Sequence, residues 1–539
     1  MRIPILLCAV VVLARAQGQW STDPAAPLQV CGTAGAPTNL RVLSDGASGW
    51  FAFWTDKRTD QTNREIYGQH LDAEGVALWP TNGKLIHTEP GSSIEELAAD
   101  VLGNGDVMIA YLFRPAMFQD TLKAVAIDID GDPVWPAPVH ITQCGSPILS
   151  LGDLRVTSTP GGAYIAWYDT YFGGSTGVNV TRITSSGVLP WGIDGYAVPG
   201  ASYGPYEIHS DHATGLILQW RTGNGSGAAL MAMRVDSSGT NVWPANVQTS
   251  AGSGGLNYAF HTAQDEFAAQ LTAWVDMPHL IVMARLDTTG ALTFSPSPVS
   301  VCTFSSDQDI PRVVLNEGYT FVGWVDNRPP AANRDLYLQK LDADGTPLWD
   351  ADGVLAIQLN SYIPTTGLVA SDSAAVIATM DANVTGYSAI RIRGDATPAW
   401  PAPVQFCTPA FNPFYAAQSQ FADGEGGIVS FWQTNSGAIH AARIYRNGLL
   451  GSPIGIEEIA PMPVLQVHPN PCGDRITITL PEVAGMDRWT IMAMDGRVIM
   501  EGSAQASSEP IDVSSLASGT YLVQAAAAGR LHTQRFVRQ

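Results

Sequence analysis

The first candidates for chemistry in this chain are one serine and a few histidines. Residues 173–177 read Gly-Gly-Ser-Thr-Gly, a GxSxG string in which Ser175 would be an acyl-transfer nucleophile. That role requires a turn from a strand into a helix, and this string lies in a glycine-rich loop between two predicted strands. His209 and His212 have no obvious third ligand, and the chain contains no HExxH, P-loop or CxxC motif. We therefore predict no catalytic residue, no metal site and no cofactor.

Two sets of charged residues recur at the same spacing and could form a binding site. The sets are Asp56, Arg58 and Arg64, and Asp326, Arg328 and Arg334. In each set five residues separate the two arginines. A carboxylate can hold guanidinium groups through paired, charge-assisted hydrogen bonds. Because the sets lie at the same register of two separate repeats, we favour a structural role, in which the aspartate bridges the guanidinium groups, over a charged ligand site.

Two acidic turns resemble fragments of calcium-binding loops. Residues 128–132 read Asp-Ile-Asp-Gly-Asp, and residues 342–345 read Asp-Ala-Asp-Gly. A complete calcium loop needs more oxygen ligands at fixed positions. Asp-Gly pairs are also common in tight turns because glycine tolerates positive φ. We interpret both segments as turns before an outer strand.

A ladder of aromatic residues predicts the framework that carries these candidates. A short apolar strand ends in tryptophan or a substitute at eight positions, spaced by 50 to 57 residues: Trp54, Tyr111, Trp167, Trp220, Trp274, Trp324, Met380 and Trp432. A second tryptophan recurs in six of the units, at Trp79, Trp135, Trp191, Trp243, Trp349 and Trp400. A regular period of this length indicates one supersecondary unit copied in series.

Each unit has the pattern of four short β-strands. Residues 65–72 and 335–342 alternate apolar and polar side chains, and residues 49–54 and 319–324 are β-rich runs that follow turns. Four antiparallel strands per unit, repeated in series, are typical of a β-propeller. We predict an all-β protein with an eight-bladed propeller. Seven blades is the alternative, because the count depends on the weak copies at Tyr111 and Met380.

The N-terminal segment predicts how the ring closes. Residues 26–31 (Ala-Pro-Leu-Gln-Val-Cys) match residues 402–407 (Ala-Pro-Val-Gln-Phe-Cys), which lie in a predicted outermost strand. We expect residues 27–32 to pair with the strand at 438–446 and so complete the last blade. The expected domains are a signal peptide at 1–16, the propeller at 17–458, a linker at 459–463 and a C-terminal β-domain at 464–539.

Composition and the first residues predict an exported protein. Arg2 precedes an apolar run over residues 3–13, and residues 14–16 (Ala-Arg-Ala) have the form of a signal-peptidase site. No later stretch reaches the roughly 18 apolar residues that a membrane-spanning helix needs. The 49 acidic and 28 basic residues give a net charge of -21, which argues against a nucleic-acid partner.

Five cysteines remain after the expected cleavage: Cys31, Cys144, Cys302, Cys407 and Cys472. An odd number leaves at least one thiol unpaired. Four of the five share one position in the repeat, so we interpret them as small buried apolar side chains.

The loops between the second and third strands of the units offer candidates for ligand binding. Loops on a rigid scaffold are where function concentrates, and exposed aromatic rings suit sugar rings or extended polymers. The candidates lie in the second and third units: Phe113, Arg114, Phe118, Tyr168, Tyr171 and Phe172. Local packing is an equal alternative for these side chains.

The C-terminal segment carries several short motifs in a fixed order. Turn dipeptides separate β-rich runs over residues 464–539 and predict a small Ig-like sandwich. The motif positions are Pro469, Asn470, Pro471, Asp474, Asp495, Gly496, Leu516, Gly519 and Tyr521. The segment resembles the type A C-terminal sorting domain of the type IX secretion system of Bacteroidetes-like bacteria. The resemblance implies that the type IX machinery is a partner, and that the protein is secreted or held at the outer-membrane surface of a Gram-negative cell.

These observations predict a monomeric, exported propeller that binds a polysaccharide or a surface protein without catalysis. A propeller glycoside hydrolase or lyase with acidic residues in the central channel is one alternative, and a structural spacer for surface display is another. Two or three carboxylates about 5 to 10 Å apart in the channel would favour the enzyme. A channel filled by apolar side chains would count against it.

Overall fold

The computed structural model describes most of the chain. The described residues are 20–32, 35–59, 61–116, 119–145, 148–171, 176–201, 205–223, 227–250, 256–276, 279–328, 334–358, 366–372, 376–382, 386–408, 413–434, 436–451, 465–479, 488–493, 497–503, 510–527 and 530–539. The expected signal peptide and linker lie outside them. The chain forms two compact units, residues 1–452 and 453–539. Within the described residues no helix is long and apolar enough to cross a membrane.

The first unit is built from eight four-stranded antiparallel sheets. We call these sheets blades 1 to 8 in chain order, and within each blade we name the strands from the inner one to the outer one. Blade 1 contains β2 (Thr38–Ser44), β3 (Trp50–Asp56), β4 (Glu65–Leu71) and β5 (Lys84–His87). Blade 2 contains β6 (Ser93–Val101), β7 (Val107–Arg114), β8 (Thr121–Ile127) and β9 (Val139–Gln143). Blade 3 contains β10 (Ile148–Thr159), β11 (Gly162–Tyr171), β12 (Thr176–Thr184) and β13 (Tyr196–Ala197). Blade 4 contains β14 (Tyr206–Ser210), β15 (Leu216–Thr222), β16 (Ala229–Val235) and β17 (Val247–Gln248).

The second half of the ring repeats this order. Blade 5 contains β18 (Leu256–Gln264), β19 (Gln270–Asp276), β20 (Leu280–Leu286) and β21 (Val299–Ser300). Blade 6 contains β22 (Gln308–Asn316), β23 (Tyr319–Asp326), β24 (Asp335–Leu341) and β25 (Val354–Ile357). Blade 7 contains β26 (Thr366–Ala370), β27 (Val376–Ala382), β28 (Gly386–Ile392) and β29 (Val404–Cys407). Blade 8 contains β30 (Pro413–Ala422), β31 (Ile428–Thr434), β32 (Ile439–Ile444) and, from the N-terminus, β1 (Leu28–Cys31).

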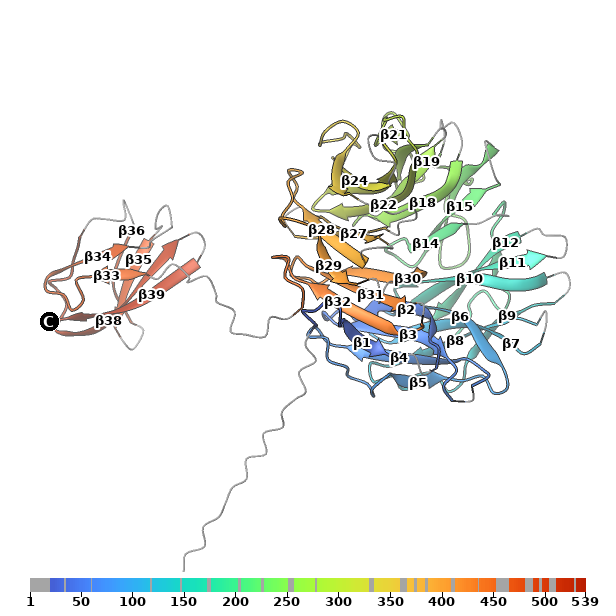
Figure 1. The fold of residues 1–539 in the computed structure, drawn as a ribbon, viewed down its shortest axis with the longest axis horizontal. Coiled ribbons are helices and arrows are strands. Elements are labelled where there is room, and N and C mark those ends of the chain that lie inside the picture. Colours follow the sequence, from blue (N-terminus) through green and yellow to red (C-terminus); the bar gives the residue numbers. More distant parts are fainter. Residues whose placement is uncertain are drawn as a thin grey trace, which may run out of the picture. The chain divides into compact units, whose positions relative to one another are not determined.

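These sheets form the predicted eight-bladed β-propeller (Figure 1). The weak copies at Tyr111 and Met380 both lie in true second strands, β7 and β27, so the eight-blade prediction is confirmed. The second strand of a blade lies between neighbouring blades, and both of its faces are covered. In β3 every residue from Trp50 to Asp56 is buried. This explains why the second strands are continuous apolar runs rather than alternating ones.

The ring closes through the N-terminus, and β1 lies beside β32 (Figure 1). Leu28 pairs with Ala441 and Cys31 with Ile439, in antiparallel register. Trp20, which precedes β1, is 1% exposed and donates its indole N–H to the carbonyl oxygen of Ala73 in blade 1 at 2.9 Å. The last blade is thus held to the first by a strand and by a buried ring.

The Trp20 contact is one of a circular set. In each case a tryptophan of one blade donates its indole N–H to a turn of the next blade, at 2.8 to 3.2 Å. Trp20 comes from the segment before β1, and each of the others follows the third strand of its blade. The donors are Trp20, Trp79, Trp135, Trp191, Trp243, Trp349 and Trp400. In blade 5 the ring of Phe294 packs against Gly345 instead. Most of these turns contain a glycine at positive φ, such as Gly75 (φ 78°), whose missing side chain leaves room for the ring.

The second unit is a small β-domain with two sheets. One sheet contains β33 (Gln466–His468), β34 (Arg475–Thr479) and β37 (Ile511–Asp512). The other contains β35 (Arg488–Ala493), β36 (Val498–Ser503), β38 (Gly519–Ala527) and β39 (Arg530–Arg538). Ile476 and Ile478 from the first sheet pack with Ile491, Val523 and Phe536 from the second. The domain therefore has one apolar core between its sheets, as the strand pattern predicted.

Candidate functional site

Three of the aromatic residues predicted for ligand binding, Phe113, Tyr168 and Tyr171, lie in the part of the chain that the structure describes, and they are buried or half-buried. Phe113 is only 8% exposed and belongs to the core between the first two blades, which corrects the expectation that its ring reaches solvent. The core position follows from its place in β7, because second strands are covered on both faces. Tyr168 is partly buried and packs edge to face on Tyr206, with ring centroids 5.1 Å apart. The hydroxyl of Tyr171 lies 3.4 Å from a carboxylate oxygen of Asp169.

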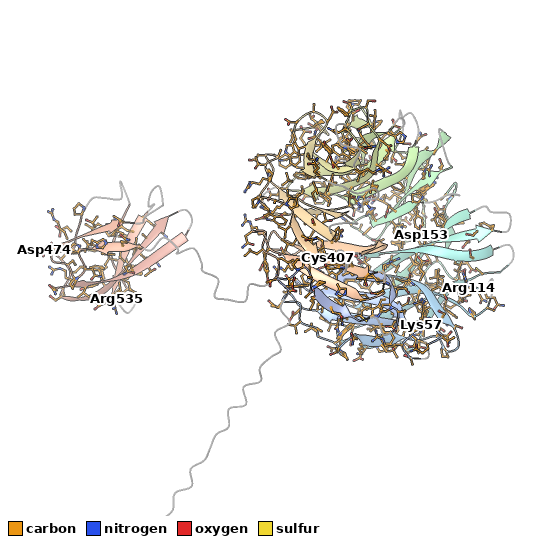
Figure 2. All side chains as sticks on the ribbon, in the orientation of Figure 1. Lys57, Arg114, Asp153, Cys407, Asp474 and Arg535 are labelled. Atoms are coloured by element: carbon orange, nitrogen blue, oxygen red, sulfur yellow. The ribbon has the colours of Figure 1, made fainter. Side chains whose placement is uncertain are left out.

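The remaining candidates of this group make local contacts or cannot be placed. Arg114 is exposed and pairs with Asp120 across the same loop, with Nη2 at 3.0 Å from Oδ2. Arg114 lies at the rim of the ring, as labelled in Figure 2. Phe118 and Phe172 lie outside the described residues. A role of this loop face in ligand binding therefore stays a prediction.

The recurring aspartates hold one arginine each, not two. Asp326 is fully buried and accepts hydrogen bonds from Trp324 Nε1 at 3.1 Å and from Arg328 Nη2 at 2.5 Å. Asp56 has the same contacts with Trp54 and Arg58.

The second arginine of each set points elsewhere. Arg64 donates to the carbonyl oxygen of Ala36 at 3.1 Å, and Arg334 lies 3.7 Å from Asp307. The expected bridge between two guanidinium groups is therefore wrong, because the second arginine of each set contacts other groups.

The cysteine position that recurs in the repeat lies against these half-buried arginines in blades 1 and 6. Arg58 Nη2 lies 3.1 Å from the sulfur of Cys31, and Arg328 Nη2 lies 3.5 Å from that of Cys302. Burial nevertheless raises the pKa of both thiols to about 11, so both are protonated at neutral pH. In the described residues these five cysteines are buried and form no disulfide. Their environment fits the predicted packing role.

Inner strands of most adjacent blades contact one another, and several of them carry a charged residue at one shared register. Arg41 pairs across its blade with Phe53, Arg155 with Ala166 and Arg312 with Gly323, and each partner directly precedes a ladder tryptophan. Glu207 and His261 occupy the same register in blades 4 and 5.

The remaining blades carry Ala98, Gly367 and Ser419 at this register. All five charged or titratable residues are only partly buried, so solvent reaches them. We call these five residues (Arg41, Arg155, Glu207, His261 and Arg312) the axial cluster.

Most carboxylates near the axial cluster already have structural partners. Glu96 accepts the backbone N–H groups of Asp153 and Leu154 at 3.2 and 2.7 Å. Asp100 accepts the backbone N–H of Ser158 at 2.6 Å. These bonds tie β6 to β10, where a bulge places Asp153 at positive φ. Asp153, labelled toward the middle of the ring in Figure 2, also pairs with Arg155 at 3.1 Å.

Glu207 is the carboxylate with a different environment. Burial raises its pKa, and the positive charges of Arg155 and Arg312 act against that shift. No ion pair holds it among the described residues. A carboxyl group with a raised pKa beside a second acid, Asp153, is the arrangement that acid catalysis uses. Glu207 was not among the predicted site residues. It occupies the same position of the inner strand as Arg41 and Arg155, so an alignment of the repeats is the signal that could have found it.

Two histidines near the axis predict acid sensitivity. Burial lowers the pKa of His209 to about 4 and that of His261 to about 3. Below about pH 6.5 the unfolded chain binds protons at these positions and the folded chain does not, so stability falls as pH falls from 6.5 toward 4. We expect a loss on the order of 1 kcal/mol per pH unit for each histidine.

Urea unfolding between pH 7.5 and 4.5 measures this effect. His261→Gln is expected to flatten the pH dependence, whereas His140→Gln, which changes an exposed histidine of β9, leaves it unchanged. An unaltered slope in the His261 variant would show that this imidazole is not the group that destabilises the fold in acid.

An exposed aromatic ring lies in blade 5, whereas the sequence predicted exposed rings in the loops of blades 2 and 3. Phe267 is 72% exposed and lies in the turn between β18 and β19. The turn is held by Asp265, whose carboxylate accepts the backbone N–H groups of Phe267 and Ala269 at 2.9 Å each. A groove of about 560 Å³ beside the ring runs between blades 5 and 6, and Glu266, Glu317 and other polar residues line it.

Comparison with known proteins identifies the C-terminal unit. Residues 466–539 match the family described as "Secretion system C-terminal sorting domain". They are a type IX secretion sorting domain. The sorting domain makes this a secreted or cell-surface protein.

Similar solved structures contain propellers of several activities. One is the polysaccharide lyase Uly1, with 10% sequence identity and a TM-score of 0.36; the match covers 57% of this chain and 77% of that one. Another is the Hadza microbial sialidase Hz136, with 10% identity and a TM-score of 0.32; the match covers 54% of this chain and 63% of that one. A third is prolyl oligopeptidase B from Galerina marginata, with 10% identity and a TM-score of 0.41; the match covers 75% of this chain and 57% of that one. The chain spans less than two thirds of the length of the last two. No curated protein matches the chain in sequence.

The motif residues of the sorting domain that can be placed tie its ends together. Asn470 accepts the backbone N–H of Val537 at 2.9 Å and donates to the carbonyl oxygen of Arg535 at 3.1 Å. Asp474 pairs with Arg538 at 2.9 Å.

The other motif positions serve the same small domain. Leu516 is buried in the core, and the Tyr521 hydroxyl donates to the carbonyl oxygen of Ala517 at 2.8 Å. Asp495 and Gly496 lie outside the described residues. Asn470 and Asp474 therefore join the segment after β33 to the last strand, β39, whereas Leu516 and Tyr521 make core and local contacts.

Proposed function

We propose that this protein is a secreted or cell-surface β-propeller that binds a glycan in the groove beside Phe267. The observation that supports the proposal most is the combination of a 72% exposed ring with a polar groove. Small-ligand sites are concave and combine aromatic side chains with a few polar groups, as this groove does. The flat face of such a ring packs on the apolar face of a sugar.

The groove also offers groups that suit sugar hydroxyls. Glu266, Glu317 and Asp344 are exposed and line it, and among the described residues none of them forms an ion pair. Ionised carboxylates accept hydrogen bonds from hydroxyl groups at short distance. The volume of about 560 Å³ is in the range of small-ligand sites. A short stretch of neutral glycan fits this chemistry better than an acidic one, which the carboxylates would repel.

A glycan array on the purified protein, with Phe267→Ala as the variant, tests the proposal. Loss of the ring is expected to weaken binding by roughly 3- to 10-fold, because one aromatic contact contributes about 1 kcal/mol. Ile193→Ala, which removes a 62% exposed apolar side chain from blade 3, is the matched control and should leave binding unchanged. Equal binding by the protein and its Phe267 variant would contradict the proposal, as would capture of a protein ligand that is insensitive to free sugar.

The raised pKa of Glu207 favours one second candidate, a glycan hydrolase or lyase with its acid at the axis. In that case Glu207→Gln would abolish the release of sugar from a bound polysaccharide while binding persists. Chromatography of oligosaccharides after incubation with the full-length protein distinguishes the two functions, because a binding protein releases no product.

A further inference from the structure

The turns that join the first and second strands of the blades differ in length. In blades 1, 2, 4, 5 and 8 five residues connect these strands, as residues 211–215 do between β14 and β15. In blade 3 the connection from β10 to β11 is only Pro160 and Gly161. In blade 6 the connection from β22 to β23 is only Glu317 and Gly318. Both glycines have positive φ, 81° and 79°, as tight two-residue turns require. A two-residue turn beside a five-residue turn leaves a hollow at this end of the ring.

Each short turn lines a groove. The groove beside Phe267, which we call the Phe267 groove, is formed by the short turn of blade 6 and the longer turn of blade 5. A second groove, of about 770 Å³, is lined by Pro160 and Gly161 together with Gly103 and Asn104 from the longer turn of blade 2. We call it the blade 3 groove. Asn104 is the third residue of its five-residue turn, as Phe267 is, so the two grooves are equivalent parts of the repeat.

The two grooves lie at the same end of the ring and are neighbours. All turns between first and second strands are at this end, because the strands have the same order in every blade. His212, which lines the blade 3 groove, donates its Nδ1–H to the carbonyl oxygen of Glu266 at 3.3 Å. Glu266 lines the Phe267 groove. The grooves therefore lie on either side of the contact between the turns of blades 4 and 5.

The blade 3 groove is polar and carries little charge. The described residues that line it include no Asp, Glu, Lys or Arg. The Ser185 hydroxyl and Nε2 of the exposed His212 form no hydrogen bond with any described residue. Hydroxyl and neutral imidazole groups exchange hydrogen bonds with uncharged hydroxyl groups, and the exposed Pro160 adds apolar surface for the carbon face of a sugar. The chemistry and the volume fit a short stretch of neutral glycan.

We propose that the blade 3 groove is a second glycan site, and that one neutral polysaccharide chain occupies it together with the Phe267 groove. The inference rests on the proposed function, because it requires that the Phe267 groove binds glycan. Two linked contacts make the second binding event intramolecular, so a polymer that reaches both grooves binds more tightly than an oligomer that fills one. The second site thus adds a preference for long chains.

Affinities for short and long forms of the same glycan test the second site in the full-length protein. The probes are a tetrasaccharide and the corresponding soluble polymer of β-glucan, mannan, xylan and starch, measured by calorimetry and by affinity electrophoresis. The unmodified protein is expected to bind one polymer about 10- to 100-fold more tightly than its tetrasaccharide. Gly103→Leu narrows the blade 3 groove, and a Cβ at this position meets no atom within 4 Å, so the fold tolerates the change.

The variants separate the two sites. Gly103→Leu is expected to lose most of the polymer preference and to keep the tetrasaccharide binding of the Phe267 groove. Ser185→Ala is expected to weaken polymer binding by roughly 3- to 10-fold through one lost hydrogen bond, and it keeps the test valid if Gly103→Leu fails to fold. Gly227→Leu is the matched control, because a Cβ there also meets no atom within 4 Å and the residue lies between β15 and β16, at the other end of the ring.

Three outcomes overturn the second site. If the polymer binds no more tightly than the tetrasaccharide, or if Gly103→Leu, Ser185→Ala and Gly227→Leu bind it equally while Phe267→Ala binds it weakly, the proposed function stands and the second site is wrong. If Phe267→Ala binds every probe as the unmodified protein does, the proposed function fails and the shared chain fails with it. Loss of the polymer preference in both Gly103→Leu and Phe267→Ala, but not in Gly227→Leu, supports one chain in two grooves.

Discussion

Replacement of Trp20 by alanine is expected to open the propeller between its first and last blades. The side chain is 1% exposed, packs edge to face on Trp50 at 5.8 Å and donates to the carbonyl oxygen of Ala73. Removal of a buried tryptophan costs about 3 to 5 kcal/mol in free energy of unfolding. At this position the loss also frees β1, whose pairing with β32 is the strand link that closes the ring.

Trp400→Ala is the matched control for Trp20→Ala. Trp400 is also 1% exposed and donates to the carbonyl oxygen of Arg446 in the next blade. Blades 7 and 8 stay joined by the chain itself, so this variant loses similar packing without a free end. Hydrogen exchange measured at Ile439 and Ala441 should rise strongly in the Trp20 variant and far less in the Trp400 variant. Equal protection in both would mean that Trp20 does not close the ring.

The repeat made the blades predictable, but not every part of the closure. The regular spacing of the ladder residues predicted eight units, with seven as the alternative because the copies at Tyr111 and Met380 are weak. The match between residues 26–31 and 402–407 indicated the displaced outer strand. Trp20 was missed because it stands alone before the first unit. Its equivalence to Trp79 and Trp400 becomes visible only when the last blade is laid against the first.

The candidate site was less predictable than the fold for a physical reason. An aromatic residue near the end of a second strand can face a loop or the next blade, and sequence does not distinguish the two; Phe113 faces the core. Phe267 lies in the turn between β18 and β19, and its exposure depends on whether the turns of neighbouring blades cover it, which the sequence does not show. The arginines of the axial cluster lie in different blades, and their common register follows only from strand pairing and from bulges such as the one between Asp309 and Arg312.

The buried aspartates of the ladder are expected to contribute more to stability than any surface charge. Asp326 is fully buried and accepts hydrogen bonds from the indole of Trp324, the hydroxyl of Ser306 and the guanidinium of Arg328. Arg328 in turn lies over the ring of Tyr337, 3.8 Å from its centroid. Asp326→Ala removes the carboxylate that accepts from three donors, and leaves the half-buried Arg328 guanidinium with the carbonyl oxygen of Asp352 but without its carboxylate partner. We expect a loss of about 3 to 5 kcal/mol in urea unfolding.

Two further variants separate charge from packing in this prediction. Asp132→Ala breaks an exposed ion pair with Lys84, in which the aspartate is 66% exposed, and should cost less than about 1 kcal/mol. Arg328→Met combined with Asp326→Ala should be less destabilising than the sum of the single changes, because no unpaired charge remains. If Asp326→Ala cost no more than Asp132→Ala, the Trp-x-Asp-x-Arg pattern would be a feature of packing alone. Its recurrence in blades 1 and 6, each time around a fully buried carboxylate, instead indicates that the polar contact fixes the indole of the ladder residue between its neighbours.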